Sequence, residues 1–166
     1  NIAFHTHNKN SLSIYDDDYV YIAMRSSTSL NVYRITLSDL TGSNVTTTEI
    51  LGDSATYDYL YPTSIAATNS YLYITNTAGD VTIANNTAPF TIQSTLSTIG
   101  NSVYNTVDWN NNNLFIANSN YGVSSYSLSS PTSPVLQTTI NTADYQAKHL
   151  SLSSDGRLII ISNGHG

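Results

Sequence analysis

Four stretches of twelve residues align without gaps along this 166-residue chain, and this internal repeat constrains the fold more than any other feature. They are "LSIYDDDYVYIA" from Leu12, "SIAATNSYLYIT" from Ser64, "TVDWNNNNLFIA" from Thr106 and "LSLSSDGRLIII" from Leu150. Each contains two short apolar runs separated by Asp, Asn, Ser, Thr or Gly, residues that mostly favour tight turns. The pattern therefore predicts a β-hairpin at each of the four positions.

The spacing of these hairpins resembles the ~40–45 residues of a four-stranded propeller blade. The segments between them match as well: "NVYRITLSD" from Asn31 parallels "GVSSYSLSS" from Gly122, and "IQSTL" from Ile92 parallels "LQTTI" from Leu136. Each unit thus carries four short strands. The sequence predicts an all-β fold, a β-propeller of four-stranded antiparallel blades, with a β-sandwich as the alternative.

The repeat divides the chain, taken as one domain over 1–166, into about 3.5 to 4 blades. The expected parts are an outer strand and loop, three full blades and a partial fourth blade, at 1–11, 12–63, 64–105, 106–149 and 150–166. The chain starts at Asn1 and stops after "ISNGHG", which is typical of a processed or excised piece. Three arrangements remain open: a segment of a larger propeller, a small ring closed on itself, or a ring or fibre completed between copies by strand addition.

Charge and composition exclude several kinds of partner and chemistry. Only 10% of residues are charged, the net charge is -6, and the five basic residues are scattered, so nucleic acid and anionic membranes are poor partners. The chain has no cysteine, which excludes disulfides, thiolate catalysis and Cys-based zinc sites. No apolar run approaches the ~20 residues of a membrane span, so membrane insertion is not expected.

Longer segments resemble two known repeat families. "YLYITNTAGDVTI" (71–83) and "LSLSSDGRLIIIS" (150–162) resemble the YVTN repeats of surface-protein propellers. "LFIANSNYGVSSYSLSSPTSPVLQTTI" (114–140) resembles the related LVIVD repeats, including the Ser-Pro-x-x-Pro between the outer strands. The resemblance covers nearly all the chain. It implies a propeller and an extracellular or cell-surface location, but no particular activity.

The loops that precede the repeated hairpins contain the candidate ligand-binding residues. Two of these loops are expected over 53–62 and 141–149. When residues are counted back from the strand that follows each loop, Asp58-Tyr59 and Asp144-Tyr145 occupy the same positions. Tyrosine offers a flat apolar face with a hydroxyl, and aspartate accepts hydrogen bonds, which together suit sugar or peptide recognition. The alternative is that the two tyrosines pack between neighbouring blades while the aspartates cap their loops.

Metal binding has weaker support. The aspartates at 16–18 lack the spaced ligand pattern of a calcium loop, so they are interpreted as turn residues. His5 and His7 share one face of a strand, and a closed ring would bring His165 near them. These histidines are an alternative site for Zn²⁺ or Cu²⁺. Their spacing brings no acidic third ligand within reach. His149 stands just before a strand and is interpreted as structural. No metal or other cofactor is expected.

Two N-glycosylation sequons, Asn44-Val45-Thr46 and Asn85-Asn86-Thr87, make Asn44 and Asn85 candidate glycan sites. Both fall near the connection between the third and fourth strands of a unit, at the outer rim of a propeller. A chain this rich in Asn, Ser and Thr also produces sequons by chance.

No catalytic motif occurs, neither G-x-S-x-G nor a P-loop nor G-x-G-x-x-G. The leading hypothesis is therefore a non-catalytic extracellular or cell-surface scaffold for adhesion or self-assembly. Its expected partners are other protein chains or copies of itself, and also glycans. The competing hypothesis is a carbohydrate-binding or carbohydrate-active propeller with its site on the loops that precede each hairpin.

Overall fold

The computed structural model describes strands in each of the four repeated units. The described residues are 11–15, 19–25, 30–36, 48–49, 62–86, 91–99, 106–110, 112–142, 145–152 and 158–164. Within these ranges the chain forms fourteen β-strands and no helix, which confirms the predicted all-β class. The described part of the chain accordingly offers no helix capable of crossing a membrane.

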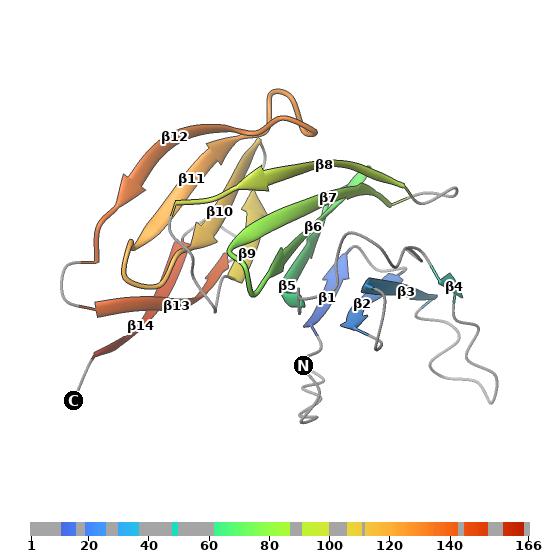
Figure 1. Ribbon diagram of the computed structural model, residues 1–166, viewed down its shortest axis with the longest axis horizontal. Helices are drawn as coiled ribbons and strands as arrows, with labels where there is room; N and C mark the ends of the chain where they lie inside the picture. The colour runs from blue at the N-terminus through green and yellow to red at the C-terminus, as the bar shows by residue number, and fades with distance from the viewer. Residues whose placement is uncertain are drawn as a thin grey trace.

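The strands group into four sheets that follow chain order (Figure 1). The first contains β1 (Ser11–Tyr15), β2 (Tyr19–Arg25), β3 (Leu30–Thr36) and β4 (Thr48–Glu49). The second contains β5 (Pro62–Ala67), β6 (Tyr71–Asn76), β7 (Asp80–Asn85) and β8 (Ile92–Ser97). The third contains β9 (Thr106–Asn110), β10 (Asn113–Ala117), β11 (Val123–Ser127) and β12 (Val135–Ile140), and the fourth β13 (Tyr145–Leu152) and β14 (Leu158–Gly164). Every pair of neighbours is antiparallel.

The first strands of successive sheets lie next to one another. β1 contacts β5, β5 contacts β9, and β9 contacts β13, while the last strands β8 and β12 run along the upper rim in Figure 1. The series is open, because no strand pairing among the described residues joins the fourth sheet back to the first. Antiparallel sheets of two to four strands are therefore confirmed, and a closed propeller stays a prediction.

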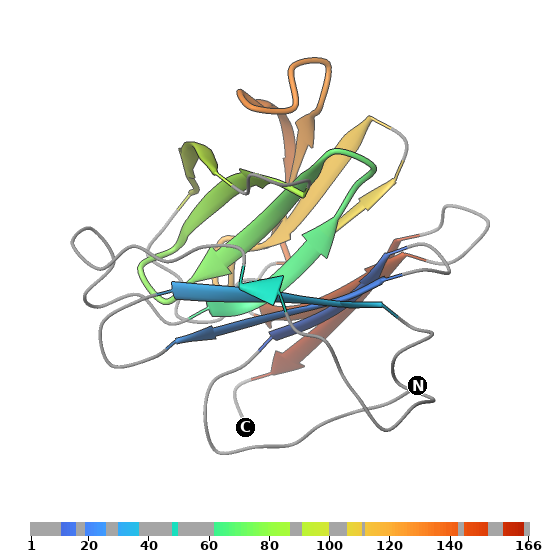
Figure 2. The ribbon, with the colours of Figure 1, turned by 90° about the vertical axis from the view of Figure 1, so that its right-hand side faces the viewer.

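Three clusters of buried side chains lie between successive sheets. Figure 2 shows the second sheet, in green, between the first sheet, in blue, and the third, in yellow and orange. The first and second sheets share Tyr21, Ala23, Val32, Ile65, Ala67, Leu72, Ile74 and Ala84. The second and third share Ala66, Tyr73, Val81, Ile83, Leu114, Ile116, Tyr126 and Leu128. The third and fourth share Ala117, Val123, Ala147 and Leu150. The core is thus divided among several layers, whereas a two-sheet sandwich has one.

The second sheet is buried on both faces, and its sequence reflects this. In β6, Leu72 and Ile74 belong to the cluster with the first sheet, while Tyr73 between them belongs to the cluster with the third. Because successive side chains of a strand point to opposite faces, burial on both faces requires a continuous apolar run. "YLYI" (71–74) is such a run.

Because of a β-bulge, β8 places apolar side chains against both the first and the third sheet. Ile83 pairs with Ser94 and Ala84 with Ile92, so Gln93 is the extra residue and the alternation of faces shifts by one. Ile92 consequently packs against the cluster with the first sheet, and Leu96 packs against the cluster with the third.

Candidate functional site

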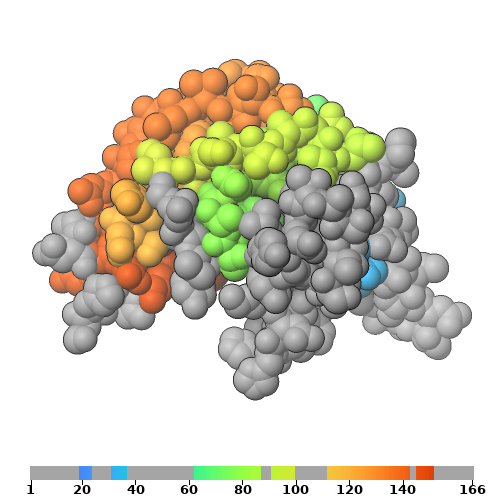
Figure 3. All heavy atoms as spheres, viewed as in Figure 1, coloured from blue at the N-terminus to red at the C-terminus, as the bar shows by residue number. Residues whose placement is uncertain are grey.

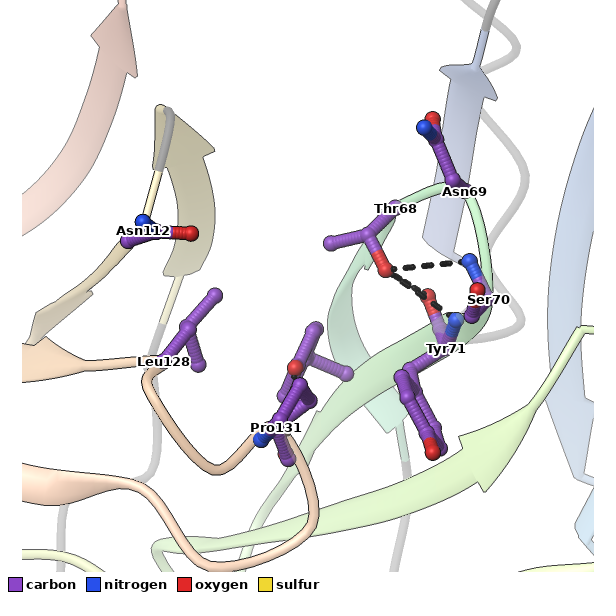
Figure 4. Close-up of a pocket in the computed structure, with 8 residues that line it drawn as sticks. Thr68, Asn69, Ser70, Tyr71, Asn112, Leu128 and Pro131 are labelled. Carbon is purple, nitrogen blue, oxygen red and sulfur yellow. Dashed lines mark hydrogen bonds between the residues drawn. The ribbon is translucent and has the colours of Figure 1, made fainter.

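An open pocket of about 270 Å³ lies between the second and third sheets (Figure 4). We call it the inter-sheet pocket; it is lined by Thr68, Asn69, Ser70, Tyr71, Tyr73, Asn112, Leu128 and Pro131. In Figure 4 the turn that carries Asn69 and Ser70 stands on one side, and Asn112 and Leu128 stand across from it. The pocket therefore joins the first turns of two neighbouring sheets to the loop between β11 and β12.

One wall is the β5–β6 turn, which its own hydrogen bonds hold in shape. The Thr68 hydroxyl accepts from the Tyr71 amide at 3.0 Å and from the Ser70 amide at 3.4 Å (Figure 4). Behind the turn, the Asn86 side chain donates to the Thr68 carbonyl at 2.6 Å. These bonds leave the exposed side chains of Asn69 and Ser70 facing solvent at the rim.

The other wall is the β11–β12 loop, which is attached to both sheets. The Leu128 amide donates to the Asn112 carbonyl at 2.6 Å, the counterpart of the bond from the Asn86 amide to the Ser70 carbonyl in the second sheet. From the second sheet, the Tyr73 hydroxyl donates to the Pro131 carbonyl at 3.1 Å and the Ser94 hydroxyl to the Thr132 carbonyl at 2.5 Å. The loop lies beside β8 on the surface seen in Figure 3. The wall is therefore fixed in position.

The lining of the pocket is uncharged. It combines two amides, two aliphatic hydroxyls, two tyrosines, a leucine and a proline, without any Lys, Arg, His, Asp or Glu. Among the lining residues, Leu128 and Tyr73 are buried, whereas Asn69, Ser70 and Asn112 are exposed and form its rim. Such a site offers hydrogen bonds and apolar contact, but no acid, base or counter-ion.

Burial raises the pKa of Tyr73 well above its ordinary value of 10.0, and the nearby Tyr71 raises it further. Burial also raises the pKa of Tyr126. Because the folded-state pKa exceeds the unfolded one, the protonated hydroxyls contribute stability that is present below about pH 10 and is lost as the pH rises above it.

We expect the free energy of unfolding, measured by urea denaturation, to fall between about pH 9 and about pH 11. Tyr73→Phe should make that fall smaller, because it removes a hydroxyl whose pKa is raised by burial. An unchanged pH dependence in this variant would contradict the assignment.

A second candidate surface is β12, the outer strand of the third sheet. All six of its residues are exposed, including Val135 (59%), Leu136 (45%) and Ile140 (46%). In β8, the equivalent strand of the second sheet, every second residue is partly buried. In β8, Ile92 and Leu96 pack against the buried clusters on the two sides of the second sheet, and the Ser94 hydroxyl donates to the Thr132 carbonyl. No residue of β12 belongs to a buried cluster among the described residues.

Of the four predicted ligand residues, only Tyr145 lies within the described residues; Asp58, Tyr59 and Asp144 lie outside them. Tyr145 is 53% exposed, so its ring is not packed away between sheets. The loop expected over 141–149 is shorter than predicted, because β13 begins at Tyr145, which pairs with Gly164. His149, expected before the strand, is an exposed residue within it.

The other predicted sites are largely outside the described residues, namely His5, His7, His165, Asn44 and the turn at 16–18. The described residues contain no group of three or more His, Cys, Asp or Glu that could hold a metal ion. Asn85 ends β7, and its side-chain oxygen accepts a hydrogen bond from the Thr91 amide. The candidate glycan sites therefore stay predictions.

The inter-sheet pocket was not predicted from the sequence, which indicated ligand residues in the loops that precede each hairpin. The available signal was the register of the repeats, which places the turns at 68–70 and 110–113 at the same end of neighbouring sheets. The Ser-Pro-x-x-Pro segment then follows the strand next to the second turn. Nothing in the sequence indicated that this segment forms hydrogen bonds with Tyr73 and Ser94 of the second sheet.

No protein-family model matches the chain, and a search of curated proteins finds no significant match.

Proposed function

We propose that this chain is a non-catalytic β-propeller-type scaffold that acts outside the cell or at its surface and assembles with copies of itself through β12. The exposure of all six residues of β12 is the observation that carries this proposal. Three of the six are apolar, Val135, Leu136 and Ile140. As an edge strand, β12 also offers unpaired backbone groups to another strand.

The propeller part of the proposal is supported by the order of the sheets. Four antiparallel sheets follow one another with their first strands adjacent. In the second and third sheets, the last strand is more exposed than the strands before it whose burial is described. Radially repeated blades have this arrangement. The low charge and the resemblance to surface-protein repeats support a location outside the cell.

The partner that fits β12 best is a second copy of the same strand. The segment "VLQTTI" (135–140) has six residues of mostly high β-propensity, without charge, proline or glycine, the composition of strands that pair with themselves. Lysine and proline often protect edge strands from pairing, and β12 has neither. A β-bulge at Gln137, opposite Ser125 and Tyr126, interrupts its register with β11. Antiparallel pairing of two β12 strands about a two-fold axis closes a dimer without changing the fold of either copy.

Light scattering of the purified chain over a dilution series tests the proposal. We expect a dimer that dissociates on dilution, and a monomer for Thr138→Lys, because two added charges face each other near the two-fold axis. The matched control is Thr95→Lys, which adds the same charge to an exposed threonine of β8. A wild-type monomer at every concentration, or equal effects of both substitutions, would contradict assembly through β12.

A further inference from the structure

We infer that the inter-sheet pocket is a binding site for one neutral sugar ring, a function separate from assembly through β12. The inference rests on the size of the pocket, the chemistry of its lining and the fixed position of its two walls.

The size suits a small ligand. Pockets that bind drug-sized molecules enclose about 300–1,000 Å³, and the inter-sheet pocket, at about 270 Å³, lies just below that range. It is also open at the rim, so a ring bound there can be the terminal unit of a longer glycan. A single pyranose ring is smaller than a drug-sized molecule and is the unit that we assign to this volume.

The lining selects a neutral polyhydroxylated ligand. A sugar ring presents carbon-bound hydrogens on its faces and hydroxyls around its edge. Tyr71, Leu128 and Pro131 provide aromatic and aliphatic contact for a face, while Asn69 and Asn112 provide amide donors and acceptors for the edge. A charged ligand finds no counter-charge among the eight lining residues.

The two rim amides are available to a ligand. The side chains of Asn69 and Asn112 are exposed, and neither makes a hydrogen bond within the described residues. They come from different sheets, yet the bonds from Asn86 to Thr68 and from Leu128 to Asn112 hold their turns in place. Because the backbone at both positions is held, ligand binding has to order only the two side chains, which limits its entropy cost.

The experiment is saturation-transfer NMR of the full chain with methyl glycosides of glucose, galactose, mannose and N-acetylglucosamine, with methyl glucuronide as the charged counterpart. We expect saturation transfer to the ring protons of at least one neutral glycoside and weaker binding of the glucuronide. Asn69→Ala and Asn112→Ala should each lower the affinity about fivefold, the effect of losing one neutral hydrogen bond. Asn120→Ala, an exposed asparagine in the β10–β11 turn, should leave the affinity unchanged.

Three results would overturn the inference. The first is the absence of saturation transfer to every neutral glycoside. The second is glucuronide binding as tight as that of the neutral sugars. The third is loss of binding in Tyr145→Ala with full binding in both pocket variants, which would place the sugar on the loops that precede the hairpins. Circular dichroism of each variant verifies that the sheets are intact.

Discussion

Gly122→Ala should lower the free energy of unfolding by about 3 kcal/mol or more, from backbone strain and overpacking together. Gly122 ends the β10–β11 turn at a φ of 80°, a conformation that residues with a Cβ rarely adopt. An added Cβ would overlap the carbonyl oxygen of Ile140 and lie 3.1 Å from the Asn141 Cα. Both obstacles are backbone atoms, so no side-chain rotation relieves them.

Urea denaturation of Gly122→Ala beside Asn120→Ala measures this effect. Asn120 is exposed in the same turn, so its truncation should change stability by no more than about 0.5 kcal/mol. A Gly122→Ala variant as stable as the wild type would show that β12 does not end against this turn, and the described packing of the third sheet would be wrong.

Tyr73→Ala should destabilise the protein by about 3–5 kcal/mol, the cost of deleting a large buried side chain. Its ring is fully buried between the second and third sheets, and its hydroxyl holds the β11–β12 loop at Pro131. Tyr73→Phe keeps the ring and removes only the hydrogen bond, so it should cost about 1 kcal/mol. The difference between the two variants separates packing from loop attachment.

The control for this series is Tyr121→Ala, since Tyr121 is 53% exposed and lies outside the buried clusters. It should be close to wild type in a urea titration. Similar losses for Tyr73→Ala and Tyr121→Ala would mean that the second and third sheets do not pack through Tyr73.

Local patterns in the sequence were sufficient to predict hairpins and their grouping. The turn at 68–70 and the four strands of the second and third units occur where the repeat predicted them, because turn residues and β-branched runs act over a few neighbouring positions. The start of β13 was placed too late, because its first residues are polar and become strand through pairing with β14.

Exposure could not be predicted in the same way. "IQSTL" in β8 and "LQTTI" in β12 have almost the same pattern, yet β8 is half covered and β12 is fully exposed. The difference depends on which sheet lies alongside, and this information is absent from either strand. The inter-sheet pocket has the same origin, since its walls come from segments about 60 residues apart, such as Tyr73 and Pro131.

Single-cysteine crosslinking tests assembly through β12 most directly, because the chain has no cysteine of its own. One cysteine at a time would replace each residue from Val135 to Ile140, with Thr95→Cys in β8 as the control, and mild oxidation would be followed by non-reducing electrophoresis. Antiparallel pairing places positions near the two-fold axis within the ~4.4–6.8 Å Cα separation that a disulfide spans. We predict high yields of crosslinked dimer at these β12 positions and little at Thr95. Yields along β12 no higher than that of the Thr95→Cys control would contradict assembly through this strand.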